Sequence, residues 1–223
     1  MHRYFVTGTD TDVGKTRVTA ALALALRQAG ATPTIVKLVQ TGVRADEAGD
    51  AQRAAAASGC TALEFARYDA PADPWSAALA CNRRPPEATA LAKRLREIAT
   101  PVVAEGAGGI AVPLNEHESF AAVAKEADLA VVITIGLRLG CINHAALTLA
   151  MCEQLGIRVA GSVLVERWQP MPAAYVADVR RTLEAKLPEL AFMAFDSDEQ
   201  RSVADAANQF VSFIQGEPVC DRS

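Results

Sequence analysis

One glycine-rich segment near the N-terminus constrains the fold of this chain more than any other feature. It consists of Gly8-Thr9-Asp10-Thr11-Asp12-Val13-Gly14-Lys15-Thr16 and lies between a short apolar run, Tyr4–Thr7, and a longer one, Thr16–Ala29. The first run has the length of a buried strand, and the second has that of a helix. A strand, a glycine-rich loop ending in Gly-Lys-Thr and a helix together form a phosphate-binding P-loop. The segment therefore predicts a nucleotide-binding α/β fold.

The P-loop pattern gives a role to each part of this segment. The backbone N–H groups of Thr9–Thr16 would surround the phosphates, because a helix N-terminus favours anions. Lys15 would reach the β- and γ-phosphates, and the Thr16 hydroxyl would bind Mg²⁺. The usual pattern has four residues between its glycines, whereas five separate Gly8 from Gly14. The alternative is a glycine-rich turn that binds no ligand.

Strand-like and helix-like runs alternate along the rest of the chain. The further strand candidates are Thr34–Val39, Pro101–Ala104, Leu129–Ile135 and Val159–Val165, and the further helix candidates are Ala54–Ala57, Glu87–Ala99, Ile142–Leu155, Tyr175–Leu187 and Val203–Ile214. The strand candidates are mostly apolar on both faces, as in a sheet that helices cover on both sides. The alternation predicts an α/β protein with a P-loop NTPase-like, doubly wound, mostly parallel sheet and helices on both faces. We expect a single P-loop domain over residues 1–223.

The composition limits the partners and the compartment. About half of the 223 residues are apolar, and the net charge of −4 lacks the basic excess of a nucleic-acid-binding protein. Five cysteines without a CxxC pair and three scattered histidines predict neither a disulfide framework nor a zinc site. No run approaches the ~20 apolar residues of a membrane-spanning helix, and the first residues leave no room for a signal peptide. We therefore expect a cytoplasmic protein that binds neither nucleic acid nor a membrane.

Two carboxylates are candidates for a magnesium shell together with Thr16. Ligands of doubly wound sheets bind beyond the carboxyl ends of the strands. Glu105 follows a strand candidate there, ahead of a predicted flexible turn, Gly106-Ala107-Gly108-Gly109. Mg²⁺ prefers oxygen ligands, usually one or two carboxylates with phosphate oxygens and water. Asp50 is the second candidate, although Gly49-Asp50 also fits the N-cap of a helix.

Lys37 lies inside the apolar run Thr34–Val39. A buried lysine costs free energy unless it is paired. One interpretation makes it a second cation at the transferred phosphoryl group. The alternative puts the strand at a sheet edge, where the ammonium group reaches solvent along its apolar stem.

Four segments together resemble the dethiobiotin synthetase family. They are the run Tyr4–Thr16, then Lys37-Leu38-Val39-Gln40-Thr41-Gly42, then Glu105-Gly106-Ala107-Gly108-Gly109, and finally Gly136-Leu137-Arg138-Leu139-Gly140-Cys141-Ile142-Asn143-His144. No general nucleotide-binding rule predicts the last run, which therefore distinguishes this family from other P-loop proteins. The resemblance covers roughly residues 3–190 in order. The family also has five residues between the two P-loop glycines.

The resemblance implies an ATP-dependent cyclo-ligase of biotin biosynthesis. In this reaction 7,8-diaminopelargonate takes up CO2 as a carbamate, ATP phosphorylates the carbamate, and the second amine attacks the mixed anhydride to give dethiobiotin, ADP and phosphate. Phosphoryl transfer depends mainly on positioning and on stabilising negative charge. By resemblance, the catalytic residues are Lys37, Lys15 and Thr11. The Mg²⁺ ligands are Thr16, Asp50 and Glu105.

The resemblance also implies a homodimer with a shared substrate site. Asn143 matches a family residue that helps the neighbouring subunit to bind the carboxylate of the diamine. Tyr175 matches another such residue, although the spacing before it differs. The other implied substrate-binding residues are Thr41, Gly106, Ala107, Gly108 and Gly109.

The chain departs from the family where the nucleotide base binds. Many members have an asparagine near the end of the strand Val159–Val165 that hydrogen-bonds adenine, and Val165 stands near that position here, followed by Glu166. We assign both residues to the nucleotide site. Valine cannot make that contact, so we expect weak discrimination between ATP and other nucleoside triphosphates. Alternatively, backbone groups of Glu166–Trp168, or stacking by Phe195, restore a preference for adenine.

Other P-loop classes compete with this interpretation. A ParA- or MinD-like ATPase switch would have a signature lysine early in the loop, where Asp10 stands. An amidotransferase of the cobyrinic-acid type would need a glutaminase domain, for which 223 residues leave no room. A GTPase would have an Asn-Lys-x-Asp motif, which does not occur. The sequence assigns no definite role to Asp12 or to the C-terminal segment.

Overall fold

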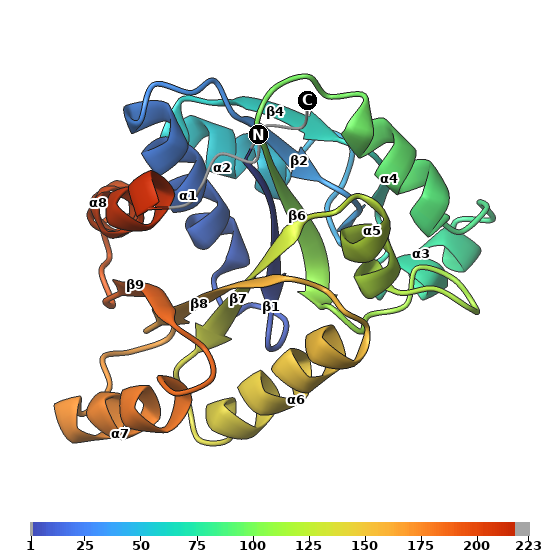
Figure 1. The fold of residues 1–223 in the computed structure, drawn as a ribbon. Coiled ribbons are helices and arrows are strands. Elements are labelled where there is room, and N and C mark those ends of the chain that lie inside the picture. The colour runs from blue at the N-terminus through green and yellow to red at the C-terminus, as the bar shows by residue number, and fades with distance from the viewer. Residues whose placement is uncertain (1, 217–223) are drawn as a thin grey trace.

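The computed structural model describes residues 2–216, in which helices follow strands along most of the chain (Figure 1). The strands are β1 (Arg3–Gly8), β2 (Thr34–Lys37), β3 (Gln40–Thr41), β4 (Thr61–Glu64), β5 (Arg67–Tyr68), β6 (Val102–Gly109), β7 (Ala130–Gly136), β8 (Val159–Val165) and β9 (Glu189–Met193). The helices are α1 (Lys15–Gln28), α2 (Asp50–Ser58), α3 (Pro74–Ala80), α4 (Ala88–Arg96), α5 (Phe120–Glu126), α6 (Cys141–Gln154), α7 (Ala173–Leu183) and α8 (Glu199–Gly216). Each predicted strand and helix is therefore present, with ends shifted by a few residues.

A parallel sheet of seven strands forms the centre of the described chain. The strand order is β4-β2-β6-β1-β7-β8-β9, and each neighbouring pair is parallel. The short strands β3 and β5 pair separately. The order changes direction around β1, which lies between β6 and β7. The predicted doubly wound parallel sheet is confirmed, and the P-loop follows its central strand.

Helices cover both faces of this sheet (Figure 1). One hydrophobic core joins Tyr4 and Val6 of β1 to α1, α2 and α8. The other joins Phe5 of the same strand to Phe120 of α5 and to α3, α4, α6 and α7. Successive side chains of a strand point to opposite faces, so a strand between two helical layers must be apolar throughout.

The glycine run after Glu105 is not the flexible turn that we expected. β6 continues through it to Gly109, which pairs with Gly8 at the end of β1. A Cβ on Gly106 would lie 2.9 Å from the Phe5 ring. Glycine is needed there for close packing against β1, not for a turn.

The sheet settles one alternative for Lys37. β2 lies between β4 and β6, so the alternative that places Lys37 at a sheet edge is wrong. Among residues 2–216, no helix is long and apolar enough to cross a membrane. The single-domain extent 1–223 stays a prediction, and Met1, Cys220 and the rest of 217–223 lie outside the described residues.

Candidate active site

The P-loop leaves β1 and leads directly into α1. Gly14 precedes the helix with a φ of +100°, a left-handed conformation that favours glycine. A Cβ on Gly8 would lie 2.6 Å from the Asp10 carbonyl oxygen, so the loop folds back over the strand end only on a glycine. The Thr9 N–H donates to the Thr134 carbonyl of β7 at 2.9 Å. These contacts hold the N-terminus of α1 at the carboxyl edge of the sheet, where it favours an anion.

Lys15 lies inside this loop. Its Nζ donates to the Asp10 carbonyl oxygen at 3.0 Å, and the residue is 7% exposed. Burial, together with the nearby positive charge of Lys37, lowers the pKa of Lys15 to about 8. An anion beside this amine would favour its charged form, so the position suits a phosphate.

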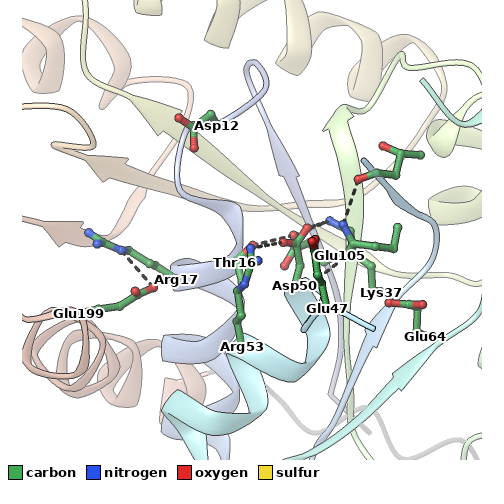
Figure 2. Close-up of polar contacts among 12 residues, drawn as sticks. Asp12, Thr16, Arg17, Lys37, Glu47, Asp50, Arg53, Glu64, Glu105 and Glu199 are labelled. Carbon is green, nitrogen blue, oxygen red and sulfur yellow. Dashed lines mark hydrogen bonds and ion pairs between the residues drawn. The ribbon is translucent and has the colours of Figure 1, made fainter. Parts of the chain in front are cut away.

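Lys37, the last residue of β2, joins two carboxylates from different elements (Figure 2). Its Nζ lies 2.6 Å from Asp50 Oδ2 and 2.7 Å from Glu105 Oε1, and it donates to the Gly106 carbonyl oxygen at 2.9 Å. Asp50 begins α2, whereas Glu105 lies in β6 beside β2. An ammonium group has three donors, and these partners use all of them. Lys37 is therefore a buried and fully paired cation.

This pairing also fixes the charge of the cluster. Burial would lower the pKa of Lys37, but the charges of Glu105 and Asp50 outweigh burial and raise that pKa above its ordinary value. Burial would likewise raise the pKa of Asp50, but the Lys37 charge lowers it below its ordinary value. Lys37 and Asp50 therefore stay charged at neutral pH.

Thr16 brings a hydroxyl group to the same place from α1. Its Oγ1 donates to Glu105 Oε1 at 3.1 Å. Glu105 is 1% exposed, and its Oε2 accepts no hydrogen bond from the part of the chain that the structure describes. A buried carboxylate oxygen without a partner is costly, and a divalent cation would satisfy it. Thr16, Asp50 and Glu105 offer oxygen alone, which is the donor set of Mg²⁺.

The protein would supply only part of such a shell. Within residues 2–216 there is no group of three or more His, Cys, Asp and Glu side chains arranged to hold a metal ion. The three candidate ligands include two carboxylates and one hydroxyl. Phosphate oxygens and water would have to complete the coordination, as is usual for Mg²⁺ at nucleotide sites.

A cavity of about 800 Å³ opens beside the P-loop and the lysine–carboxylate cluster. It borders many of the predicted site residues, namely Thr11, Asp12, Gly14, Lys15, Thr16, Lys37, Thr41, Asp50, Glu105, Ala107 and Gly108. It also borders polar residues that the sequence does not single out, namely Arg17, Gln40, Arg53, Asp73, Arg167 and Glu199. The volume is that of a small-molecule site.

The two residues assigned to the base pocket do not border this cavity. Val165 is 1% exposed, and its Cγ1 would lie 3.1 Å from a Cβ on Gly14, so it packs beneath the P-loop. Glu166 accepts the N–H groups of Met171 at 2.9 Å and Phe195 at 3.0 Å. Its carboxylate therefore connects two loops. Other predicted residues that do not border the cavity are Thr9, Asp10, Val13, Gly106 and Gly109.

Asn143 and Tyr175 also lie apart from the cavity of their own chain. Asn143 is exposed on α6. The Tyr175 hydroxyl donates to the Arg138 carbonyl oxygen at 2.6 Å and lies 3.5 Å from Cys141 Sγ. Burial, with the Cys141 contact, raises the pKa of Tyr175 to about 12. The hydroxyl thus connects α7 to the loop before α6.

Two ion pairs at the P-loop were not predicted from the sequence. Arg138 pairs with Asp10, and Arg167 Nη2 lies 3.0 Å from Asp12 Oδ1. The backbone of Asp12 is left-handed, with a φ of +57°, which is uncommon for a residue other than glycine. The ion pair with Arg167 helps to hold Asp12 in this conformation. Arg138 belongs to the distinctive run Gly136–His144, so the sequence did draw attention to this residue. For Arg167 no sequence signal exists, because its partner lies 155 residues away.

The chain is similar to enzymes of one family over most of its length. A family described as an AAA domain matches residues 2–194. The ATP-dependent dethiobiotin synthetase BioD of Nitrosospira multiformis is 38% identical over 203 residues, which are 87% of this chain and 89% of the relative. The ATP-dependent dethiobiotin synthetase BioD of Pseudescherichia vulneris is 37% identical over 213 residues, 88% of each chain.

Solved structures of other P-loop proteins share the fold at low identity. The MinC:MinD cell division protein complex of Aquifex aeolicus matches with a TM-score of 0.61 and 12% identity, over 100% of this chain and 99% of that chain. At this identity the likeness shows the fold alone. It confirms the predicted P-loop NTPase-like α/β fold and gives no support to an ATPase switch.

Proposed function

The chain belongs to the family of ATP-dependent dethiobiotin synthetases, and on that premise we propose how its cavity brings the reaction about. It is an ATP-dependent ligase that forms dethiobiotin. In our proposal, 7,8-diaminopelargonate and CO2 form a carbamate in the cavity. A carbamate oxygen attacks the γ-phosphorus of ATP and ADP leaves. The second amine then attacks the carbamoyl carbon, and phosphate leaves as the ring closes.

The observation that best supports this proposal is the buried cluster of Lys37, Asp50 and Glu105 beside the P-loop. Both reaction steps gather negative charge on phosphoryl and carbamoyl oxygens. Preorganised positive charges stabilise such oxygens strongly, because no reorganisation is needed when the negative charge develops. Lys37 Nζ lies 2.6 Å from Asp50 Oδ2 and 2.7 Å from Glu105 Oε1 at the wall of the cavity, so the cluster offers an ammonium group to the phosphoryl and carbamoyl oxygens and two carboxylates to a cation.

Lys15 and Lys37 are the proposed cations of the reaction. Lys15 would hold the β- and γ-phosphates from inside the P-loop. Lys37 would bind the carbamate and γ-phosphate oxygens. Since its three donors already have partners, a substrate oxygen would replace one of them. Thr11 and Thr41, which border the cavity, would donate hydroxyl hydrogen bonds to the same oxygens.

Thr16, Asp50 and Glu105 are the proposed ligands of Mg²⁺. All three residues offer oxygen atoms, which suit a hard divalent cation. Glu105 Oε2 has no hydrogen-bond partner among the described residues, so it is free to bind one. When bound, Mg²⁺ would neutralise charge on the phosphate oxygens. Glu105 would stay fixed by Thr16 and Lys37, which both contact its Oε1.

The homodimer with a shared substrate site belongs to the same proposal. Asn143 is exposed on α6 and does not border the cavity of its own chain. Both facts agree with a role toward a neighbouring subunit. Tyr175 would act mainly by holding the loop before α6, since its hydroxyl donates to Arg138. The predicted cytoplasmic location stays a prediction.

One assay tests the reaction. Purified protein with ATP, Mg²⁺, bicarbonate and 7,8-diaminopelargonate should yield dethiobiotin and ADP in equal amounts, and phosphate release should require the diamine. Lys37→Gln is the variant that tests the role of the lysine, because it should lose product formation more than nucleotide binding. ADP formation that ignores the diamine and gives no cyclic urea would contradict the proposal and favour an ATPase switch.

A further inference from the structure

A buried glutamine connects β3 to the start of α2, beside the proposed metal ligands at the wall of the cavity. Gln40 Oε1 accepts the Asp50 N–H at 2.7 Å, and Gln40 is 3% exposed. The N-cap residue of α2 is Gly49, which has no side chain to accept a helix N–H. Gln40 therefore supplies, from another element, the cap that this helix lacks.

The glutamine itself is held in place on two sides. Its own N–H donates to the Ala66 carbonyl oxygen at 2.8 Å, which anchors β3 beside β5. Its Nε2 donates to the Thr41 carbonyl oxygen at 3.3 Å, so the amide group is oriented with its oxygen toward Asp50. The Gln40 acceptor oxygen is thus oriented by contacts that do not involve α2.

Gly49 lies against this support, so a larger residue there would have to displace the side chains that form it. A Cβ there would lie 2.6 Å from Arg67 Nη2, 2.8 Å from Glu64 Oε2 and 2.9 Å from Gln40 Oε1. Arg67 and Glu64 are joined by two hydrogen bonds of 2.7 and 2.8 Å. A planar, two-pronged ion pair of this kind is geometrically rigid.

The same arginine fixes the loop that precedes α2. Arg67 Nη1 donates to the carbonyl oxygens of Arg44 at 2.6 Å and Glu47 at 2.9 Å. The chain before and at the start of α2 is therefore held by side chains from β3, β4 and β5. With its backbone fixed, Asp50 directs Oδ2 onto Lys37 at 2.6 Å (Figure 2).

We propose that Gln40 is a positioning residue, which holds the Asp50 carboxylate at the metal and phosphate end of the cavity through the Asp50 N–H. The inference rests on the proposed role of Asp50 as a Mg²⁺ ligand. Partners that orient metal ligands without touching the metal often matter for metal affinity nearly as much as the ligands. Gln40 acts through backbone position, so it sets how well Mg²⁺ binds and has no part in the chemical step.

The test compares Gln40→Met with Gln40→Glu. Methionine keeps the length of the side chain but removes the acceptor oxygen, whereas glutamate keeps it. Mg²⁺ binding is measured by titration calorimetry with ADP present, so no turnover is needed. We expect Gln40→Met to weaken Mg²⁺ binding by about 10–100-fold. Gln40→Glu should bind Mg²⁺ more tightly than Gln40→Met, because it keeps an acceptor oxygen for the Asp50 N–H.

A matched control separates positioning from general destabilisation. Ser119→Ala removes the cap of α5, where Ser119 Oγ accepts the Ala121 N–H at 3.3 Å, and it lies outside the cavity. This variant should leave Mg²⁺ affinity unchanged. In steady-state assays, Gln40→Met should raise the half-saturating Mg²⁺ concentration while kcat at saturating Mg²⁺ stays near that of the unchanged protein.

Asp50→Asn distinguishes failure of this inference from failure of the proposed function. Weaker Mg²⁺ binding in both Asp50→Asn and Gln40→Met supports the proposal. Weaker binding in Asp50→Asn with none in Gln40→Met overturns the positioning role and leaves the metal shell intact. Unchanged binding in Asp50→Asn overturns the metal shell and with it the inference.

Discussion

Replacing Lys37 by methionine should make the protein depend on magnesium for its stability. Methionine has an unbranched stem of similar length, so the change removes a charge with little loss of packing. Asp50 and Glu105 then lose a partner that lies 2.6 and 2.7 Å from them. Leaving a buried charge without its partner costs about 3–5 kcal/mol of unfolding free energy. We expect a loss of this size in the absence of metal.

Added magnesium should recover part of that loss. Without the ammonium group, a divalent cation becomes the available counter-charge for Asp50 and Glu105. A ligand that binds only the native state at about 100 times its Kd stabilises it by about 2.7 kcal/mol. The unchanged protein should gain less, because Lys37 already neutralises the carboxylates and repels the ion.

The assay is urea unfolding without nucleotide, in EDTA and in excess Mg²⁺. Lys93→Met is the matched control, since Lys93 is exposed on α4. The double variant Lys37→Met with Glu105→Gln removes one buried charge along with the cation. It should be more stable in EDTA than Lys37→Met and should lose most of the magnesium response, because the two sites are coupled.

Equal effects of magnesium on the unchanged protein, Lys37→Met and Lys93→Met would refute this reasoning. So would a Lys37→Met protein as stable in EDTA as the unchanged one. Activity provides a second readout at saturating Mg²⁺. Loss of a preorganised charge donor should lower kcat about 100–1,000-fold even where magnesium has restored the fold.

Three further predictions follow from the site. Glu105→Gln should raise the half-saturating Mg²⁺ concentration at least about tenfold, and an unchanged magnesium dependence would contradict its place in the metal shell. Mixing inactive Lys15→Ala with inactive Asn143→Ala should restore part of the activity in a two-fold dimer, because one hybrid site regains both residues; no recovery despite subunit exchange would count against a shared site. Values of kcat/KM for ATP, GTP, CTP and UTP should agree within about tenfold, or ~1.4 kcal/mol, because Val165 makes no polar contact with a base. A preference for ATP above about a thousandfold would show that another group recognises adenine.

The strands and helices that could be predicted are those with a strong apolar signal, either a continuous apolar run or a helical spacing of apolar residues. β1, β7 and β8 are buried between two helical layers, so their sequences are continuous runs of Val, Ile and other apolar residues. The missed strands have weaker signals. β4 alternates exposed and half-buried residues at one edge of the sheet, and β9 lies at the other edge with exposed Glu189. The missed helices α3 and α5 span only seven residues each, too few to show a helical period.

The glycines of β6 show why a residue type can be recognised while its role is missed. Glycine is common in turns, which is why the run 106–109 predicts one. Its actual cause is the Phe5 ring, which would lie 2.9 Å from a Cβ on Gly106. Phe5 belongs to β1, roughly a hundred residues earlier in the chain. A clash with a distant side chain leaves no local pattern, so no reading of the nearby sequence could distinguish it from a turn.

The same limit applies to the candidate site, and it separates the groups that act from those that orient them. Lys15, Lys37 and Glu105 could be predicted because each lies near the carboxyl end of a predicted strand, and the carboxyl ends of parallel strands meet at one edge. Whether Lys37 is paired or exposed depends on Asp50 and Glu105, which reach it from α2 and β6. Gln40 is harder still. Its function exists only through the position of α2, since its acceptor oxygen serves a backbone N–H ten residues away. Chemistry at strand ends is therefore predictable in kind from one sequence, whereas the contacts that set its strength require the assembled fold.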